Sequence, residues 1–166
     1  MEKTSPAKTG CNIASVNRHI MSVARDAALV YAATGDMRYG RMAAKVFEVY
    51  MKGIACRNVP TDLNHGHQQT LVGMTTFEVI HEDVINELTQ MYPLIRNLVK
   101  NDQAIIEIGF KKWAENIIAN GVPHNNWNLF QADFIVKIAL VLQDNNAYAD
   151  GKGKQYYLDY VVNQNS

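Results

Sequence analysis

Two polar clusters in the sequence carry residue types that could bind a ligand. Amide and imidazole groups exchange hydrogen bonds with hydroxyls, and an indole ring can cover an apolar face, so such a set suits a carbohydrate. Each cluster precedes a predicted helix, and loops on a rigid scaffold often hold binding residues. The clusters comprise Asn64, His65, Gly66, His67, Gln68 and Gln69 and, further on, His124, Asn125, Asn126, Trp127 and Asn128.

Simpler structural roles exist for part of the second cluster. Either Asn125 or Asn126 could cap the helix predicted to begin at Trp127, because an Asn side chain accepts hydrogen bonds from free N–H groups at a helix start. Trp127 could pack into the core at that point. Trp113, which lies in the middle of a predicted helix between Phe110 and Ile117, is interpreted as a core residue.

Other chemistries find little support in the sequence. His65 and His67 are two residues apart and belong to no metal-binding motif, so we expect no metal and no cofactor. There is no Gly-x-Ser-x-Gly sequence, no phosphate-binding Gly-rich loop, and no Cys beside a His. The carboxylates are scattered over predicted helix faces, which favours solvated charge; Asp133 and Glu115 are the pair to test for hydrolysis.

Composition narrows the class of protein. The chain has 166 residues and is 48% hydrophobic, which suits one domain with a substantial core. Its formal net charge of zero argues against nucleic-acid binding. No apolar run is long enough to cross a membrane, and the polar Met1–Gly10 stretch predicts no signal peptide within the chain. Cys11 and Cys56 could pair but form no disulfide framework.

The elements that must position the clusters are all predicted to be helical. We expect a loop or disordered start over residues 1–12 and one domain over residues 13–166. The main start and stop signals are Thr34-Gly35-Asp36, Gly53, Asp102 and Asn120-Gly121, and Pro93 should kink or interrupt its helix. The predicted helices cover about 13–34, 38–52, 68–80 with a continuation from about 83 to 99, 103–119, a stretch from 127, and 154–162. No segment alternates like a strand, so the fold class is all-α, built of consecutive antiparallel helical hairpins.

Several segments together resemble the helical domain of polysaccharide lyases of the heparinase II/III-like and alginate-lyase-like kind. They are Ala27–Tyr31 with Thr34-Gly35-Asp36, His67–Leu71, Met91–Ile95, Trp113–Ile118 and His124–Trp127, spread over about residues 20–165. The resemblance implies part of an incomplete α/α toroid whose groove binds an acidic, uronate-containing polysaccharide. It implies cleavage by β-elimination, and a periplasmic or secreted parent protein.

The same resemblance implies roles for individual residues. Asn126, with Asn125 as the alternative, matches the Asn that neutralises the uronate carboxylate, and His124 and Trp127 would line the groove. Gln69 and Gln68 match a Gln facing that groove, while a second alignment places Asn64-His65-Gly66 on the Asn-His-Gly of the family. Arg57, Lys111 and Lys112 are the candidate basic contacts to the polysaccharide.

One expected part of the catalytic set has no counterpart in the chain. The resemblance places a catalytic Tyr beyond Ser166, and Tyr148, Tyr156, Tyr157 and Tyr160 follow Asn126 too closely to match it. We therefore expect a lyase fragment with little activity alone. The alternatives are a non-catalytic helical-repeat interaction module and an α/α-toroid glycoside hydrolase.

A fragment of this kind predicts self-association. Its last hairpins would lack neighbours, leaving apolar faces around Phe134, Ile138, Tyr157 and Val161 partly uncovered. The expected assembly is a homo-oligomer.

Overall fold

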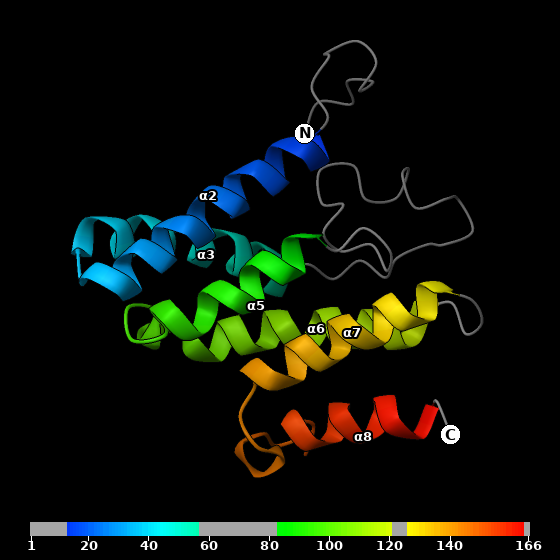
Figure 1. Ribbon diagram of the computed structural model, residues 1–166. Helices are drawn as coiled ribbons and strands as arrows, with labels where there is room; N and C mark the ends of the chain where they lie inside the picture. Colours follow the sequence, from blue (N-terminus) through cyan, green and yellow to red (C-terminus); the bar gives the residue numbers. More distant parts are fainter. Residues whose placement is uncertain (1–12, 57–82, 121–125, 165–166) are drawn as a thin grey trace.

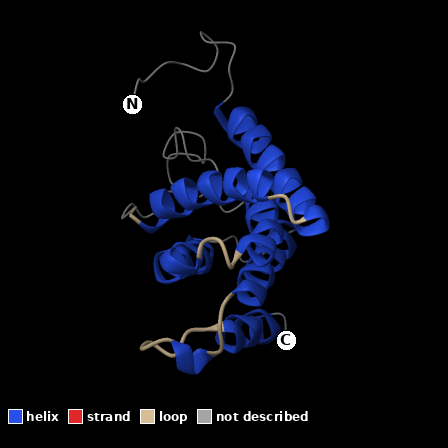
Figure 2. Ribbon diagram, turned by 90° about the vertical axis from the view of Figure 1, so that its left-hand side faces the viewer, coloured by secondary structure: helices blue, strands red, loops and turns tan. Residues whose placement is uncertain are grey.

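The computed structural model describes residues 13–56, 83–120 and 126–164, and these residues form helices joined by short turns. Six α-helices and two 3-10 helices occur in the described part, with no strand there (Figure 2). The all-α prediction is confirmed. The α-helices are α2 (Ile13–Thr34), α3 (Met37–Ala55), α5 (Asp83–Ile95), α6 (Gln103–Asn120), α7 (Asn126–Val141) and α8 (Lys154–Gln164), with 3-10 turns η3 (Lys100–Asp102) and η4 (Asn145–Ala147).

Consecutive helices reverse direction throughout the described chain. In Figure 1, α2, α5 and α7 run from right to left, and α3, α6 and α8 run back. Helix α2 packs on α5 and α5 on α7, while α3 packs on α6 and α7 on α8. The helices therefore follow the predicted hairpin order. The closure of such hairpins into a toroid stays a prediction.

Local signals fix the turn between α2 and α3 as predicted. Gly35 adopts a positive φ of 72°, and its N–H donates a 2.8 Å hydrogen bond to the carbonyl of Tyr31, which closes α2. Asp36 then caps α3, because its carboxylate accepts a 2.9 Å hydrogen bond from the Arg38 N–H. Gly53, in contrast, does not end α3. The helix continues to Ala55, and Gly53 does not adopt the positive φ that ends α2 at Gly35.

The prediction that the helix after residue 83 extends to about Val99 is wrong. Helix α5 ends at Ile95, two residues after Pro93. Pro93 has no backbone N–H to donate to the carbonyl one turn earlier. The last turn of α5 therefore lacks one helical hydrogen bond and is less stable. The Leu98 N–H donates instead to the Ile95 carbonyl, and the chain turns toward α6.

An aromatic cluster joins three helices in the centre of the core. The rings of Phe47 in α3 and Tyr92 in α5 stack with centroids 5.3 Å apart, and Phe110 in α6 lies 5.7 Å from Tyr92. Such ring contacts add about 0.5–1.5 kcal/mol to the apolar burial. Trp113 is fully buried beside this cluster, which confirms its predicted core role.

The spacing of apolar residues in the sequence predicts a core-facing stripe on α3 made of Met42, Val46, Val49 and Tyr50, and the observed burial differs from it. Met42 and Val49 are 43% and 61% exposed, and Ala43, Ala44 and Phe47 are buried instead. The buried face of α3 combines small residues with the large side chains of Phe47, Met51 and Ile54. In α2, Ile20 and Val23 are likewise exposed while Ala24, Ala27 and Ala28 are buried.

The residues expected to lie uncovered on the last hairpins are mostly buried. Phe134, Ile138 and Tyr157 belong to the hydrophobic core, and Val161 packs against it. Helices α7 and α8 cover one another's apolar faces, which removes this basis for self-association. Self-association itself stays a prediction.

Candidate functional site

Most residues of the predicted sugar site fall outside the described part of the structure. These are His65, Gln68, Gln69, His124 and Asn125. Asn126 and Trp127 are the first two residues of α7, so their place in the helix is described although their side chains are not. The structure therefore fixes where on the scaffold the central candidate, Asn126, is held.

The register of α7 places Asn126 on the outward face of that helix. An α-helix turns about 100° per residue, so positions 126, 130 and 133 lie along one stripe. Phe130 and Asp133 on this stripe are exposed, whereas Phe134, Ile135 and Ile138 are buried in the core. By the same rotation Trp127 occupies the register of Phe134 and Ile138. This register favours the core interpretation of Trp127.

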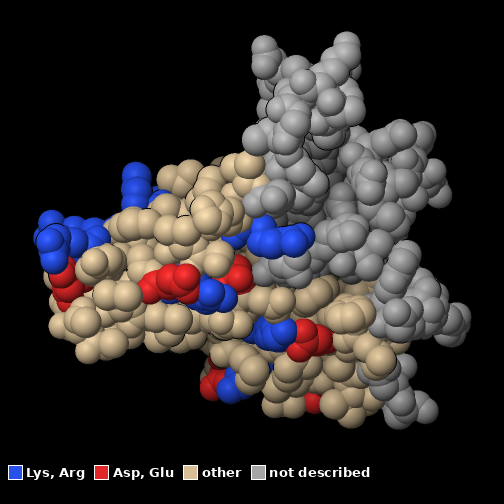
Figure 3. Space-filling model, turned by 45° about the horizontal axis from the view of Figure 1, so that its top comes forward, with Lys and Arg blue, Asp and Glu red and all other residues tan. Residues whose placement is uncertain are grey.

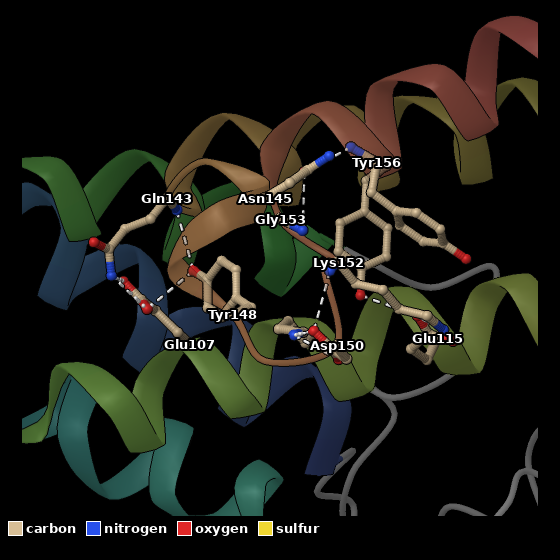
Figure 4. Close-up of polar contacts among 11 residues, drawn as sticks. Glu107, Glu115, Gln143, Asn145, Tyr148, Asp150, Lys152, Gly153 and Tyr156 are labelled. Atoms are coloured by element: carbon tan, nitrogen blue, oxygen red, sulfur yellow. Dashed lines mark hydrogen bonds and ion pairs between the residues drawn. The ribbon is translucent and has the colours of Figure 1, made fainter.

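Polar side chains also gather around the buried carboxylate of Glu107 in α6, in a cluster that the sequence did not predict as a site (Figure 4). Glu107 is only 3% exposed. Tyr148 Oη donates to its Oε2 at 3.0 Å, Gln143 Nε2 donates to the same oxygen at 3.0 Å, and Gln103 Nε2 donates to Oε1 at 2.8 Å. Arg96 Nη2 lies 3.8 Å from Oε1. Such donors compensate the cost of burying the charge.

A matching arrangement surrounds Glu115, two turns further along α6. Its Oε1 accepts 3.0 Å hydrogen bonds from Tyr157 Oη and from Lys152 Nζ. The Lys152 ammonium also lies 5.1 Å from the centre of the Tyr156 ring. Glu107 and Glu115 thus tie α6 to the segment that joins α7 and α8.

The segment between α7 and α8 is itself held by its own side chains (Figure 4). Asn145 Oδ1 accepts hydrogen bonds from the backbone N–H groups of Gly153 and Tyr156, at 3.1 and 3.0 Å. Gly151 adopts a positive φ of 67° that favours glycine. The Asn and Gly residues of this turn were the available sequence signal. The contacts to α6 come instead from Gln143 and Tyr148, whose partner Glu107 lies 36 and 41 residues away.

The two tyrosines in these clusters are poor proton acceptors. Burial, together with the nearby Glu107 carboxylate, raises the pKa of Tyr148 well above its ordinary value. Burial and Glu115 likewise raise the pKa of Tyr157. Both phenols therefore stay protonated at neutral pH, and their hydroxyls serve as donors to the carboxylates. These hydrogen bonds stabilise the fold by satisfying the two carboxylates.

Of the remaining candidate charges, Arg57 lies outside the described residues, and the others have partners within the protein. Lys111 Nζ pairs with Asp150 at 2.7 Å and lies 4.2 Å from the centre of the Tyr148 ring, and Lys112 donates to the Ala55 carbonyl. Asp133, one of the carboxylates to test for hydrolysis, pairs with Lys137. Neither lysine is held ready for a polysaccharide, and Glu115 and Asp133 each have a lysine partner of their own.

Charged side chains of both signs are mixed on the surface of the described part. On the face seen in Figure 3, acidic and basic side chains lie in small mixed groups separated by wider uncharged areas. Arg25 illustrates this pairing, with Glu87 at 2.7 Å and Asp26 at 2.8 Å. No group of three or more His, Cys, Asp or Glu residues suited to a metal occurs among the described residues. None of the described helices combines the length and apolar character needed to cross a membrane.

The described helices agree with the all-helical domain that the resemblance to polysaccharide lyases implied. A family model described as alginate lyase matches residues 3–164, nearly the whole chain. The chain belongs to the alginate lyase family, a group of polysaccharide lyases. The heparinase II/III-like part of the resemblance has no counterpart in this match. No curated protein and no solved structure matches the chain significantly.

Proposed function

We propose that this chain supplies part of the substrate groove of an enzyme that cleaves a uronate-containing polysaccharide by β-elimination, with Asn126 as the carboxylate-neutralising residue. In this reaction a base takes the proton from C5 of the uronate. The electron pair forms a double bond between C4 and C5, and the bond from C4 to O4 breaks, with O4 taking up a proton. Negative charge grows on the carboxyl group as C5 loses its proton, so a fixed donor there lowers the barrier.

The single observation that carries the role of Asn126 is its position in α7. It is the first residue of that helix, on the stripe that includes the exposed Phe130 and Asp133. Backbone N–H groups in the first turn of a helix lack partners within the helix, and the helix dipole favours an anion at this end. A uronate carboxylate next to Asn126 would accept hydrogen bonds from these N–H groups, and the helix dipole would stabilise its negative charge.

The family match and the positions of the other proposed groove residues in the sequence support their roles. We propose that His124 and Gln69 contact the sugar, with Gln68, Asn125 and His65 as further contacts. Trp127 is the weakest of these candidates, because its register in α7 is that of the buried Phe134. The base that takes the C5 proton is not one of Tyr148 and Tyr157, since both are engaged by carboxylates.

Binding and turnover measured together test this proposal. The chain is titrated with alginate, a heparan-type polymer and a neutral glucan, while the absorbance of unsaturated uronates is followed. We expect alginate binding that Asn126→Ala weakens about tenfold or more, the effect of losing a hydrogen bond to a charged group. Asn146→Ala, which alters an exposed Asn in η4, is the matched control and should bind normally.

The outcomes separate the competing functions. Binding without turnover supports a groove that lacks its base, as expected for a lyase fragment. Turnover would mean that this chain holds the base after all. Absence of binding to every uronate polymer would overturn the proposal and favour the helical-repeat interaction module.

Two further proposals follow the same family assignment. We propose that the parent protein acts in the periplasm or outside the cell, where such polysaccharides occur, and cell fractionation tests this. We also propose self-association through exposed apolar side chains such as Val16 and Ile20 of α2. A monodisperse monomer in light scattering would contradict that assembly.

A further inference from the structure

The outward stripe of α7 holds two large apolar side chains close to Asn126. Leu129 is 69% exposed and Phe130 is 52% exposed, although the opposite face of the same helix is buried in the core. The core of the described residues does not include either side chain. Figure 1 shows this end of α7, drawn in yellow, on the side of the molecule where α8 also ends. Other large apolar side chains, such as Val49 and Leu140, are equally exposed, so the feature that distinguishes Phe130 is its position one helical turn from Asn126.

The spacing relates Phe130 directly to Asn126. Residues four apart in a helix are neighbours on one face, separated by about one turn or ~6 Å along the axis. That separation suits one pyranose ring. The face of an aromatic ring carries partial negative charge and attracts the C–H groups of a sugar, while it offers nothing to the carboxylate itself.

The charges beyond Phe130 do not oppose an acidic polymer. Asp133, the next residue on the stripe, pairs with Lys137 one turn further on. Lys137 Nζ also donates a 2.6 Å hydrogen bond to Asn86 Oδ1 of α5, which fixes the ammonium beside the carboxylate. Because the lysine neutralises Asp133, a polyuronate lying along α7 meets no net negative charge at this point.

We propose that Phe130 is a substrate-positioning residue that stacks against the pyranose ring of the uronate whose carboxylate is received at Asn126. The inference rests on the proposed function and adds to it the apolar half of the sugar contact. The occupant of this patch is therefore a sugar ring of an acidic polysaccharide. Stacking would hold the ring while Asn126 neutralises its carboxylate, so Phe130 acts on orientation and not on proton transfer.

The experiment compares Phe130→Ala with Phe130→Tyr, using alginate oligosaccharides of defined length and calorimetry on the full chain. Leu140→Ala is the matched control, because Leu140 is a 59% exposed apolar residue on the same face of α7, far from Asn126. We expect Phe130→Ala to weaken binding about tenfold, Phe130→Tyr to stay within about twofold of the unaltered chain, and Leu140→Ala to bind normally. The thermal midpoint should not change in any of them, since none of these side chains is in the core.

Salt dependence separates stacking from an electrostatic effect. Apolar contact is not screened by ions, so the weakening by Phe130→Ala should be the same at low and high ionic strength, whereas binding at Asn126 should weaken with salt. Normal binding by Phe130→Ala, or equal losses in Phe130→Ala and Phe130→Tyr, would overturn the inference while the unaltered chain still binds alginate. If the unaltered chain binds no alginate, the proposed function fails first and the inference falls with it.

Discussion

The hydroxyl of Tyr148 donates a 3.0 Å hydrogen bond to the buried carboxylate of Glu107, across 41 residues of sequence. The Gln143 N–H donates in turn to the same hydroxyl at 3.1 Å, so the tyrosine both gives and accepts. This contact fastens the turn between α7 and α8 onto α6. The contribution of this single hydrogen bond to the stability of the last hairpin can therefore be measured.

Tyr148→Phe should destabilise the protein by about 1–2 kcal/mol, because Glu107 then keeps its burial but loses one donor. Urea denaturation measures the change. Tyr39→Phe removes a hydroxyl from an exposed ring in α3 and should leave the midpoint unchanged. Equal midpoints for the two variants would mean that the Tyr148 hydroxyl does not stabilise the fold.

Stability should decline at alkaline pH through the same residues. The pKa values of Tyr148 and Tyr157 are raised in the folded protein, mainly by burial, so the folded state holds these protons more tightly than the unfolded chain. Their contribution is complete below about pH 10 and is lost as pH rises through the folded pKa values.

Urea midpoints followed from about pH 8 to about pH 11 test this sign. The double variant Tyr148→Phe, Tyr157→Phe is less stable at the start of this range but should lose less stability across it. A decline as steep as that of the unaltered protein would show that other groups cause the alkaline loss.

Acid should weaken the start of α3. Hydrogen bonds from the Arg38 side chain and from its N–H lower the pKa of Asp36 to about 2. Because the folded pKa is depressed, this contribution is present above the ordinary carboxyl pKa near 4 and is lost as pH falls toward about 2. Asp36→Asn keeps a capping oxygen without the titration, so its stability should fall less over this range. Circular dichroism during acid titration measures the difference.

Gly40 and Gly53, both in α3, should respond oppositely to alanine. A Cβ at Gly40 would lie 2.8 Å from Leu98 Cδ1 and from Tyr31 Cδ2, so Gly40→Ala should cost about 1–3 kcal/mol through overpacking. No atom lies within 4 Å of a Cβ at Gly53, and Gly53→Ala should stabilise the helix by up to about 1 kcal/mol. Thermal melts of both variants provide the comparison. A stabilised Gly40→Ala would mean that α2 and α3 are less closely packed than described.

Much of the fold could be predicted from local sequence. Gly35 has the positive φ that a helix end favours, and Asp36 caps the helix that follows, both from interactions within a few residues. The helical nature of the chain follows from the same local periodicity. The outward register of Asn126, in contrast, follows from which residues of α7 are buried. Phe130, four residues further on, could have been related to Asn126 by spacing alone, although its exposure could not.

Which faces are buried, and which polar groups meet, was decided only by tertiary structure. Val49 suits a core by its chemistry yet is exposed, because the face of α3 that holds Phe47, Met51 and Ile54 is the one packed into the core. Glu107 reads as a surface charge in the sequence, and its partners Gln143 and Tyr148 lie 36 and 41 residues away. Spacing along one helix reports neighbours within a turn or two, whereas these contacts depend on how separate helices pack. The sequence by itself therefore determined the helices and their order. The packing of the helices determined which side chains are buried, which form polar contacts between helices and which are exposed.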